Sequence, residues 1–195
     1  MPSETTPRGR PRDARSHAAI LAATADLLAE TGYAAMSLGA VATRAGVGKD
    51  TIYRRWSGKA ELVYEAVFTT TDTAPVPDTG TLEGDLTALV QQLIDEFGAP
   101  AAAPALPGLL ADLAASPALL ARIRSGFLGP AKRRLAVVFD RARARGETGP
   151  EVDGDLVLDL LLGTVVFRLG VLGAPADSRL ARSMAGITAK GIEVR

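Results

Sequence analysis

The residues best suited to chemistry lie in one short segment, SLGAVATRAGVGKDTIYRRWSGK, at positions 37–59. Its hydroxyl, phenol, guanidinium and ammonium groups can donate hydrogen bonds to phosphate oxygens and to base edges, and its acid can accept one from cytosine. The chemistry that this set supports is the binding of a nucleic acid. Its members on the second of the two predicted helices are Lys49, Asp50, Thr51, Tyr53, Arg54 and Arg55.

Catalytic chemistry has few candidates in this chain. The sequence has no Cys and one His, His17, which excludes thiol nucleophiles, thiolate zinc sites and His-based triads. No pair of acids stands at a recognisable spacing for general acid–base catalysis. We therefore expect no catalytic residue, no metal and no cofactor, and keep a small helical enzyme or a small-molecule-binding protein without DNA function as alternatives.

Two short helices are needed to position the polar set. Ser37 can cap a helix over 38–45 that ends at Gly46, and a second helix over 49–55 can follow directly. Apolar residues inside the pair would fix its crossing angle and leave the polar face of the second helix free to enter a major groove. The pattern predicts a helix-turn-helix; the alternative is an ordinary helical hairpin with a solvated basic face.

The remaining segments also have helical spacing, and none shows the alternation of a strand. One apolar stripe runs from about residue 13 to Gly32, and the Pro- and Gly-containing segment TDTAPVPDTG at 71–80 separates the first helices from the rest. The fold class is therefore all-α, with about nine helices. The predicted parts are a disordered basic arm at 1–12, a three-helix DNA-binding domain at 13–58, a connecting helix at 59–72 and a helical C-terminal domain at 80–195.

The charges are unevenly distributed along a chain whose net charge is zero. Residues 1–60 hold nine Lys and Arg against five Asp and Glu, a net charge of +4, and the remainder holds 13 against 17, a net charge of −4. A basic end on a neutral chain is typical of a nucleic-acid-binding module joined to a second domain. The arm GRPR at 9–12 is predicted to bind phosphates or the minor groove, or else to be a solubilising tail.

Composition and hydropathy indicate a cytoplasmic protein without a membrane span. The chain of 195 residues is 47% hydrophobic and 23% charged, and its N-terminus has no apolar signal region. The segment Leu156–Leu172 is nearly all apolar but too short to cross a bilayer, and it contains Asp159 and Arg168. We expect each of these two charges to pair with another residue; a ligand contact or a subunit contact is the alternative.

The stretch ILAATADLLAETGYAAMSLGAVATRAGVGKDTIYRRWSGKAELVYEAV resembles the N-terminal domain of the tetracycline-repressor-like (TetR) family of bacterial transcription regulators. The matching elements are Gly32-Tyr33, Ser37, Ala45-Gly46-Val47, Thr51-Ile52-Tyr53 and Lys59-Ala60-Glu61-Leu62. The resemblance covers about 55 residues, and the remaining two thirds of the chain agrees with the family only in the number and order of its helices.

The resemblance implies a homodimeric repressor that binds a palindromic DNA operator and is released by a small, largely apolar effector. A constitutive, ligand-independent DNA-binding regulator is the alternative. By their positions in the family motif, Tyr53 and Lys59 are expected on phosphates and Lys49, Asp50 and Arg54 near base edges. The phosphate contacts would be completed by Ser37, Thr51 and Arg55. Some relatives have a base-reading Arg at the position of Gly39.

The C-terminal domain is expected to hold both an effector pocket and the dimer interface. Apolar stripes alone cannot separate a pocket from a packed core. The candidate pocket residues are Leu89, Leu93, Phe97, Leu110, Phe127, Phe139 and Val166. The last two helices carry more apolar surface than a monomer of this size should expose. The candidate interface residues are Leu156, Leu160, Leu161, Thr164, Phe167, Leu180, Met184 and Ile187.

Overall fold

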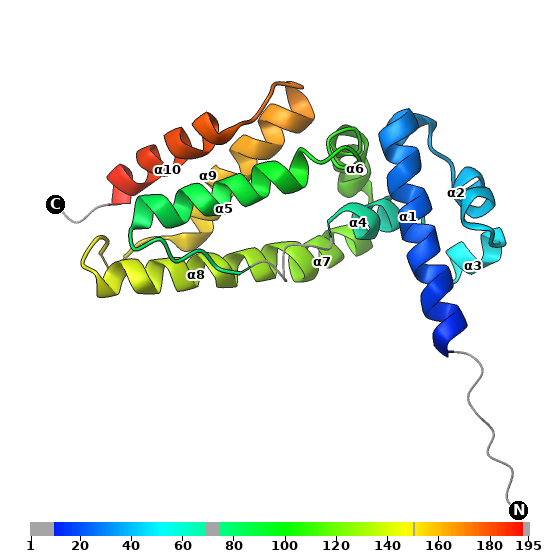
Figure 1. Ribbon diagram of the computed structural model, residues 1–195, viewed down its shortest axis with the longest axis horizontal. Helices are drawn as coiled ribbons and strands as arrows, with labels where there is room; N and C mark the ends of the chain where they lie inside the picture. The colour runs from blue at the N-terminus through cyan, green and yellow to red at the C-terminus, as the bar shows by residue number, and fades with distance from the viewer. Residues whose placement is uncertain (1–9, 69–74, 150, 193–195) are drawn as a thin grey trace, which may run out of the picture.

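Every regular element in the described part of the chain is a helix (Figure 1). The computed structural model describes residues 10–68, 75–149 and 151–192, with side chains from residue 13. The α-helices are α1 (Arg10–Ala35), α2 (Leu38–Ala45), α3 (Lys49–Tyr53), α4 (Lys59–Val67), α5 (Leu82–Phe97), α6 (Leu106–Ala115), α7 (Pro117–Ile123), α8 (Gly129–Ala144), α9 (Gly154–Val166) and α10 (Ser178–Ile192), with π-helical turns η1 (Arg124–Leu128) and η2 (Phe167–Val171).

The first three helices lie in the segment that the sequence predicts to be a DNA-binding domain. Gly32, with φ of 74°, interrupts α1 at the residue where the apolar stripe ends. The side chain of Ser37 accepts a hydrogen bond from the backbone N–H of Ala40 and so caps α2, and Gly46 ends α2 in the left-handed conformation with φ of 65°. Both caps were expected from residue type, since a hydroxyl satisfies a free N–H and glycine adopts positive φ without strain.

Three boundaries differ from the sequence-based expectation. Helix α1 begins at Arg10, so residues 10–12 form its first turn rather than part of the arm, whose residues 1–9 lie outside the described chain. Helix α3 ends at Tyr53 instead of residue 55. Helix α4 ends at Val67 rather than 72, because Phe68 leaves helical geometry as its side chain enters the core; residues 69–74 lie outside the described chain.

Helix α5 is the centre of the C-terminal domain and contacts α8, α9 and α10 (Figure 1). Its apolar stripe is buried, as the spacing predicts. Asp85 is also fully buried. Its Oδ1 accepts hydrogen bonds from the backbone N–H and the hydroxyl of Thr79 at 2.6 and 2.8 Å, which replace hydrogen bonds to water. This acid therefore holds the chain that enters α5.

Helices α7 and α8 join through η1 into one continuous helix from Pro117 to Ala144. The residues at both junctions, Arg124 and Gly129, have helical backbone angles. Counted as one helix, this rod brings the described helices to nine. Among the described residues no single helix is long and apolar enough to span a membrane. Helix α6 and the rod together would be long and apolar enough, but their axes are bent by 119° from one another.

Helix α6 joins the two domains by direct packing. Gly108 lies against the ring of Tyr33 so closely that a Cβ atom built on it would be 2.1 Å from Cδ1 of the ring. The Tyr33 hydroxyl donates a hydrogen bond to the carboxylate of Asp112, one turn further along α6. Burial and this hydrogen bond both raise the pKa of Tyr33, so the phenol keeps its proton and remains a donor. A side chain at position 108 would separate α6 from α1.

We predict that Gly108→Ala destabilises the protein, because the new methyl group overlaps the ring of Tyr33. Overpacking of this kind lowers the free energy of unfolding by about 1–3 kcal/mol. Urea unfolding followed by circular dichroism measures the change. Gly191→Ala in α10 is the control, since no atom lies within 4 Å of its built Cβ, and its stability should stay near that of the wild type. Equal stability of both variants would contradict the close contact.

Candidate nucleic-acid interface and ligand cavity

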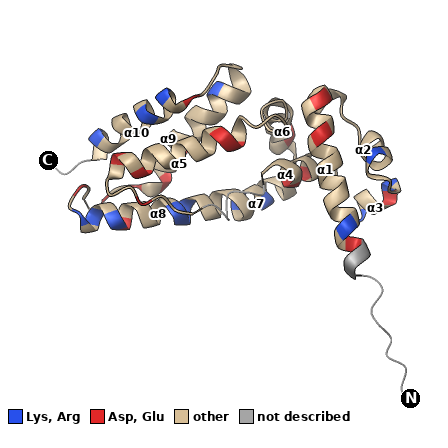
Figure 2. Cartoon of the chain, viewed as in Figure 1, with Lys and Arg blue, Asp and Glu red and all other residues tan. Residues whose placement is uncertain are grey.

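Helix α3 presents a polar face that is held in place from behind. Ile52 and Trp56 are 0% and 1% exposed, whereas Tyr53 is 57% exposed. Three more of the predicted DNA-contacting residues are exposed on this helix and at its end: Lys49, Asp50 and Arg54. Basic residues also occur along α8 and α10 (Figure 2), so charge alone does not distinguish this surface. What distinguishes this surface is that its polar residues lie on an exposed helix whose other side is buried.

Lys49 reaches from α3 across the first turn of α2. A Cβ atom built on Gly39 would lie 3.0 Å from Cε and 3.2 Å from Nζ of Lys49. The absence of a side chain at position 39 therefore leaves room for the ammonium group beside Ser37. Lys49 therefore places its cation next to position 39 of α2.

Arg55 and Lys59 are turned toward the protein. Arg55 forms an ion pair with Asp13 of α1 and also donates to the Asp13 carbonyl at 3.0 Å. The Lys59 ammonium lies 4.3 Å from the ring centroid of Tyr33, and burial lowers the pKa of Lys59 although the charge of Asp112 raises it. These two basic residues, and the partly buried Thr51, are thus less accessible than the exposed face of α3.

A polar cluster behind α3 escaped the sequence analysis. Glu65 on α4 accepts hydrogen bonds from Trp56 Nε1 at 2.8 Å and from Arg122 at 2.6 Å, and its other oxygen lies 3.1 Å from Nε2 of His17. The rings of His17 and Trp56 stack with centroids 5.3 Å apart. Burial raises the pKa of Glu65, but the hydrogen bonds from Trp56 and Arg122 outweigh burial and hold this pKa below its usual value. No local motif signals the cluster, since its members come from four separate segments.

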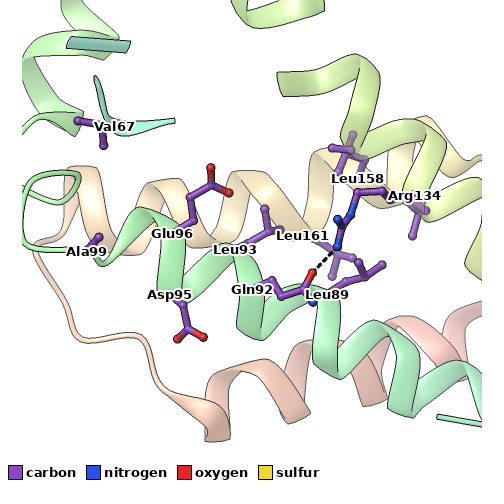
Figure 3. Close-up of a pocket in the computed structure, with 12 residues that line it drawn as sticks. Val67, Leu89, Gln92, Leu93, Asp95, Glu96, Ala99, Arg134, Leu158 and Leu161 are labelled. Carbon is purple, nitrogen blue, oxygen red and sulfur yellow. Dashed lines mark hydrogen bonds between the residues drawn. The ribbon is translucent and has the colours of Figure 1, made fainter. Parts of the chain in front are cut away.

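The C-terminal domain contains a cavity of about 390 Å³ between α4, α5, α8 and α9. Leu93 and Glu96 project from α5 toward the side where Val67 lies, and Arg134 of α8 donates a hydrogen bond to Gln92 (Figure 3). Arg134 is 9% exposed. The lining consists of Val67, Leu89, Gln92, Leu93, Asp95, Glu96, Ala99, Ala131, Arg134, Leu135, Leu158 and Leu161. Its volume falls in the range of small-molecule sites, about 300–1,000 Å³.

Two of the seven predicted pocket residues, Leu89 and Leu93, line this cavity. The other five do not: Phe97, Leu110, Phe127, Phe139 and Val166. The rings of Phe97 and Phe127 pack edge to face with centroids 5.4 Å apart, which makes them core residues. The polar members of the lining were missed because long side chains on amphipathic helices are usually solvated.

An apolar surface covers one face of α9, η2 and α10. Its exposed members are Leu156, Leu160, Phe167, Val171, Leu172 and Ile187. Of the predicted interface residues, Thr164 is also exposed and Leu180 is partly buried. Leu161 and Met184 are 3% and 9% exposed and belong to the core, so the prediction is wrong for these two. Their faces of α9 and α10 point inward at α5.

The two charges in the apolar segment do not pair as expected. Arg168 donates to the carbonyl of Pro175 at 3.1 Å, closing the loop after η2. Its Nε is buried without a hydrogen-bond partner, and Asp159 is exposed. In the described part of the chain neither side chain forms an ion pair. The expected structural salt bridges are therefore absent from this region.

A supported helix-turn-helix joined to a helical domain with a cavity defines the class of helix-turn-helix transcription regulators. Residues 20–66 match the family model "Bacterial regulatory proteins, tetR family", and residues 76–187 match "Tetracyclin repressor-like, C-terminal domain". The chain belongs to the TetR family of DNA-binding transcription regulators, which confirms the resemblance seen in the sequence.

Individual proteins agree over most of their length. The chain is 31% identical over 187 residues to an uncharacterized HTH-type transcriptional regulator, YdeS of Bacillus subtilis, covering 95% of this chain and 94% of that protein. It is 37% identical over 164 residues to the DNA-binding transcriptional repressor TetR of Mycobacteroides abscessus, covering 82% and 84%. The crystal structure of the TetR family regulator SCO0332 superimposes with a TM-score of 0.69 at 26% identity, covering 91% and 98%.

We predict that Ser37 has two separable roles, as the cap of α2 and as a phosphate contact. Ser37→Ala removes the acceptor for the Ala40 N–H and should lower the free energy of unfolding by about 0.5–2 kcal/mol. Ser37→Asp keeps an acceptor and should restore stability, but its negative charge should weaken DNA binding. Thermal unfolding and DNA titration of both variants test this. Wild-type DNA affinity of Ser37→Asp would rule out the phosphate contact.

Proposed function

We propose that the protein is a repressor that binds a palindromic operator as a homodimer and releases it when a small, largely apolar effector enters the cavity. The observation that carries the proposal is the arrangement of α3: Ile52 and Trp56 are buried while Lys49, Tyr53 and Arg54 face outward. A helix fixed in this way can enter a major groove without rearrangement. The name of the M. abscessus relative, a transcriptional repressor, supports the sign of regulation.

The exposed residues divide into positioning and reading roles. Arg54 can donate two hydrogen bonds to guanine, and Asp50 can accept one from cytosine. Tyr53 and Ser37 suit phosphates, and Lys49, whose ammonium lies above Gly39, suits either a phosphate or a base edge. Thr51, Arg55 and Lys59 are proposed as phosphate contacts of lesser weight, because their side chains are partly engaged inside the protein.

The lining of the cavity determines which kind of effector can bind there. Eight of its lining residues are Val, Leu or Ala, and among its four polar members Arg134 donates a hydrogen bond to Gln92. An effector that fits would have an apolar body and one polar end. Such a ligand gains affinity from apolar burial and orientation from a few hydrogen bonds.

A dimer accounts for the exposed apolar face of α9, η2 and α10. Contiguous apolar patches of this kind are normally covered by a partner, and a two-fold axis would place the same patch of each subunit against the other. The two recognition helices of such a dimer must lie about 34–36 Å apart to reach successive major grooves. The proposed interface comprises Leu156, Leu160, Thr164, Phe167, Leu180 and Ile187.

We predict that Arg54 reads sequence and Tyr53 does not. The wild type is first used to select a duplex from a random pool. On this duplex Arg54→Ala should weaken the binding free energy on the order of 1–3 kcal/mol per half-site, and on a scrambled duplex it should weaken it less. Tyr53→Phe removes a neutral phosphate contact and should weaken both complexes slightly. Fluorescence anisotropy at several salt concentrations measures each affinity.

Arg143→Ala is the matched control for Arg54→Ala, because Arg143 is an exposed arginine near the end of α8, far from α3 (Figure 1). It should leave both affinities unchanged. Equal losses on both duplexes for Arg54→Ala would make Arg54 a phosphate contact, and no loss from either variant of α3 would overturn the helix-turn-helix assignment. Transcription from a promoter that carries the selected site should fall when the wild type is added; a rise would identify an activator.

We predict a dimer in solution, with twice the 20.2 kDa mass of one chain. Leu160 is 57% exposed in the middle of the apolar face, so Leu160→Glu should give monomers. Val137→Glu is the control, since Val137 is 37% exposed on α8 outside that face. Sedimentation equilibrium at micromolar concentration distinguishes the states. A monomeric wild type would refute both the dimer and the palindromic operator.

A further inference from the structure

We infer that Arg122 of α7 is the residue that couples the recognition helix to the cavity: it positions the end of α3 through Glu61 and Glu65 and loses this hold when the cavity is filled. The inference rests on the proposed function and adds to it the residues that carry the regulation. Its basis is a set of contacts that joins three separate segments behind α3.

Arg122 holds two carboxylates that lie one turn apart on α4. Its Nη2 is 2.6 Å from Oε2 of Glu65, and its Nη1 is 3.7 Å from Oε2 of Glu61. The planar guanidinium engages both acids at once, which a lysine could not do in the same geometry. We call this arrangement the Arg122 clamp.

The two carboxylates in turn hold the residues that leave α3. Glu65 accepts from the indole N–H of Trp56 at 2.8 Å, and Glu61 accepts from the backbone N–H of Ser57 at 2.8 Å. The backbone N–H of Trp56 donates to the carbonyl of Ile52, so Trp56 extends the last turn of α3. Each acid therefore links Arg122 to the end of the recognition helix by a chain of two contacts.

The cavity is lined by the end of α4 and by α8, which continues the helix that carries Arg122. Val67, two residues beyond Glu65 on α4, lines one side, while Ala131 and Leu135 of α8 line another. Arg122 is on the same continuous helix as Ala131, nine residues earlier, which corresponds to about 13 Å along an ideal helix axis. A ligand that pushes α4 away from α8 acts directly against the clamp.

The packing of η1 against α4 limits how α4 can move when the cavity is filled. A Cβ atom built on Gly126 would lie 2.9 Å from the hydroxyl of Tyr64, so η1 already touches α4 and cannot move closer. Packed cores respond to added volume by shifting between discrete arrangements rather than by compression. The ion pairs of Arg122 are partly exposed, so separating them costs less than opening the apolar contacts around Leu62 and Val63.

Filling the cavity from within replaces the unidentified effector in the test. Ala131→Phe places a ring in the cavity, and Ala99→Phe does so from the end of α5 as a second variant if the first does not fold. In the wild-type background each should reduce affinity for the selected duplex on the order of tenfold, a typical allosteric coupling. In the Arg122→Gln background the same filling should change affinity less than twofold, because the clamp is already absent.

Trp56 supplies an independent readout, since it is the only tryptophan of the chain. Cavity filling should shift its emission in the wild type and not in Arg122→Gln, because only the wild type has a clamp to open. Arg122→Lys should restore part of the response through a single ion pair to Glu65. Lys132→Gln is the matched control: it removes another cation of the same rod, paired with Asp155 at 2.6 Å, and should leave both effects of filling intact.

The outcomes separate this inference from the proposed function. If neither filling variant changes DNA affinity in the wild-type background, the cavity does not control DNA binding and both fail. If filling weakens DNA binding equally with and without Arg122, the cavity acts by another route and the inference is overturned while the proposed function stands. Loss of coupling in Arg122→Gln together with its retention in Lys132→Gln is the expected result.

Discussion

The burial of α4 on two sides is the constraint on which the rest of the structure depends. Leu62 and Val63 are fully buried and Tyr64 is 7% exposed, so this helix serves as the last wall of the DNA-binding domain and the first wall of the C-terminal domain. One continuous core runs from Ile20 in α1 to Ala189 in α10. The orientation of α3 therefore depends on how α4 packs against α6, α7 and η1.

The polar contacts at the junction add direction to this apolar packing. Hydrophobic burial is non-directional, whereas the hydrogen bonds from Tyr33 to Asp112 and from Arg122 to Glu65 require a particular distance and orientation of donor and acceptor. Both pairs connect α1 or α4 with the C-terminal domain. The pKa of Glu65 is held below its usual value and that of Tyr33 is raised, so Glu65 stays ionised as an acceptor and Tyr33 stays protonated as a donor.

Apolar residues of this chain lie in three environments that hydropathy alone does not distinguish. On α9, Leu158 and Leu161 line the cavity, Val165 is buried in the core and Leu160 is exposed on the proposed dimer face. The helical period assigns these residues to different sides of one helix. Apolar residues on different sides of α9 therefore lie in the core, along the cavity and on an exposed face, so this helix is apolar almost all round.

The sequence by itself determined the elements that depend on local chemistry. The cap at Ser37, the breaks at Gly32 and Gly46 and the exposed polar run on α3 follow from residue type and spacing, because each is decided within a few residues of chain. Contacts between distant segments were decided only by the tertiary structure. Lys49 over Gly39, Arg55 on Asp13 and Glu65 between Trp56 and Arg122 each need helices brought together by packing, and the cavity is the volume which that packing leaves unfilled.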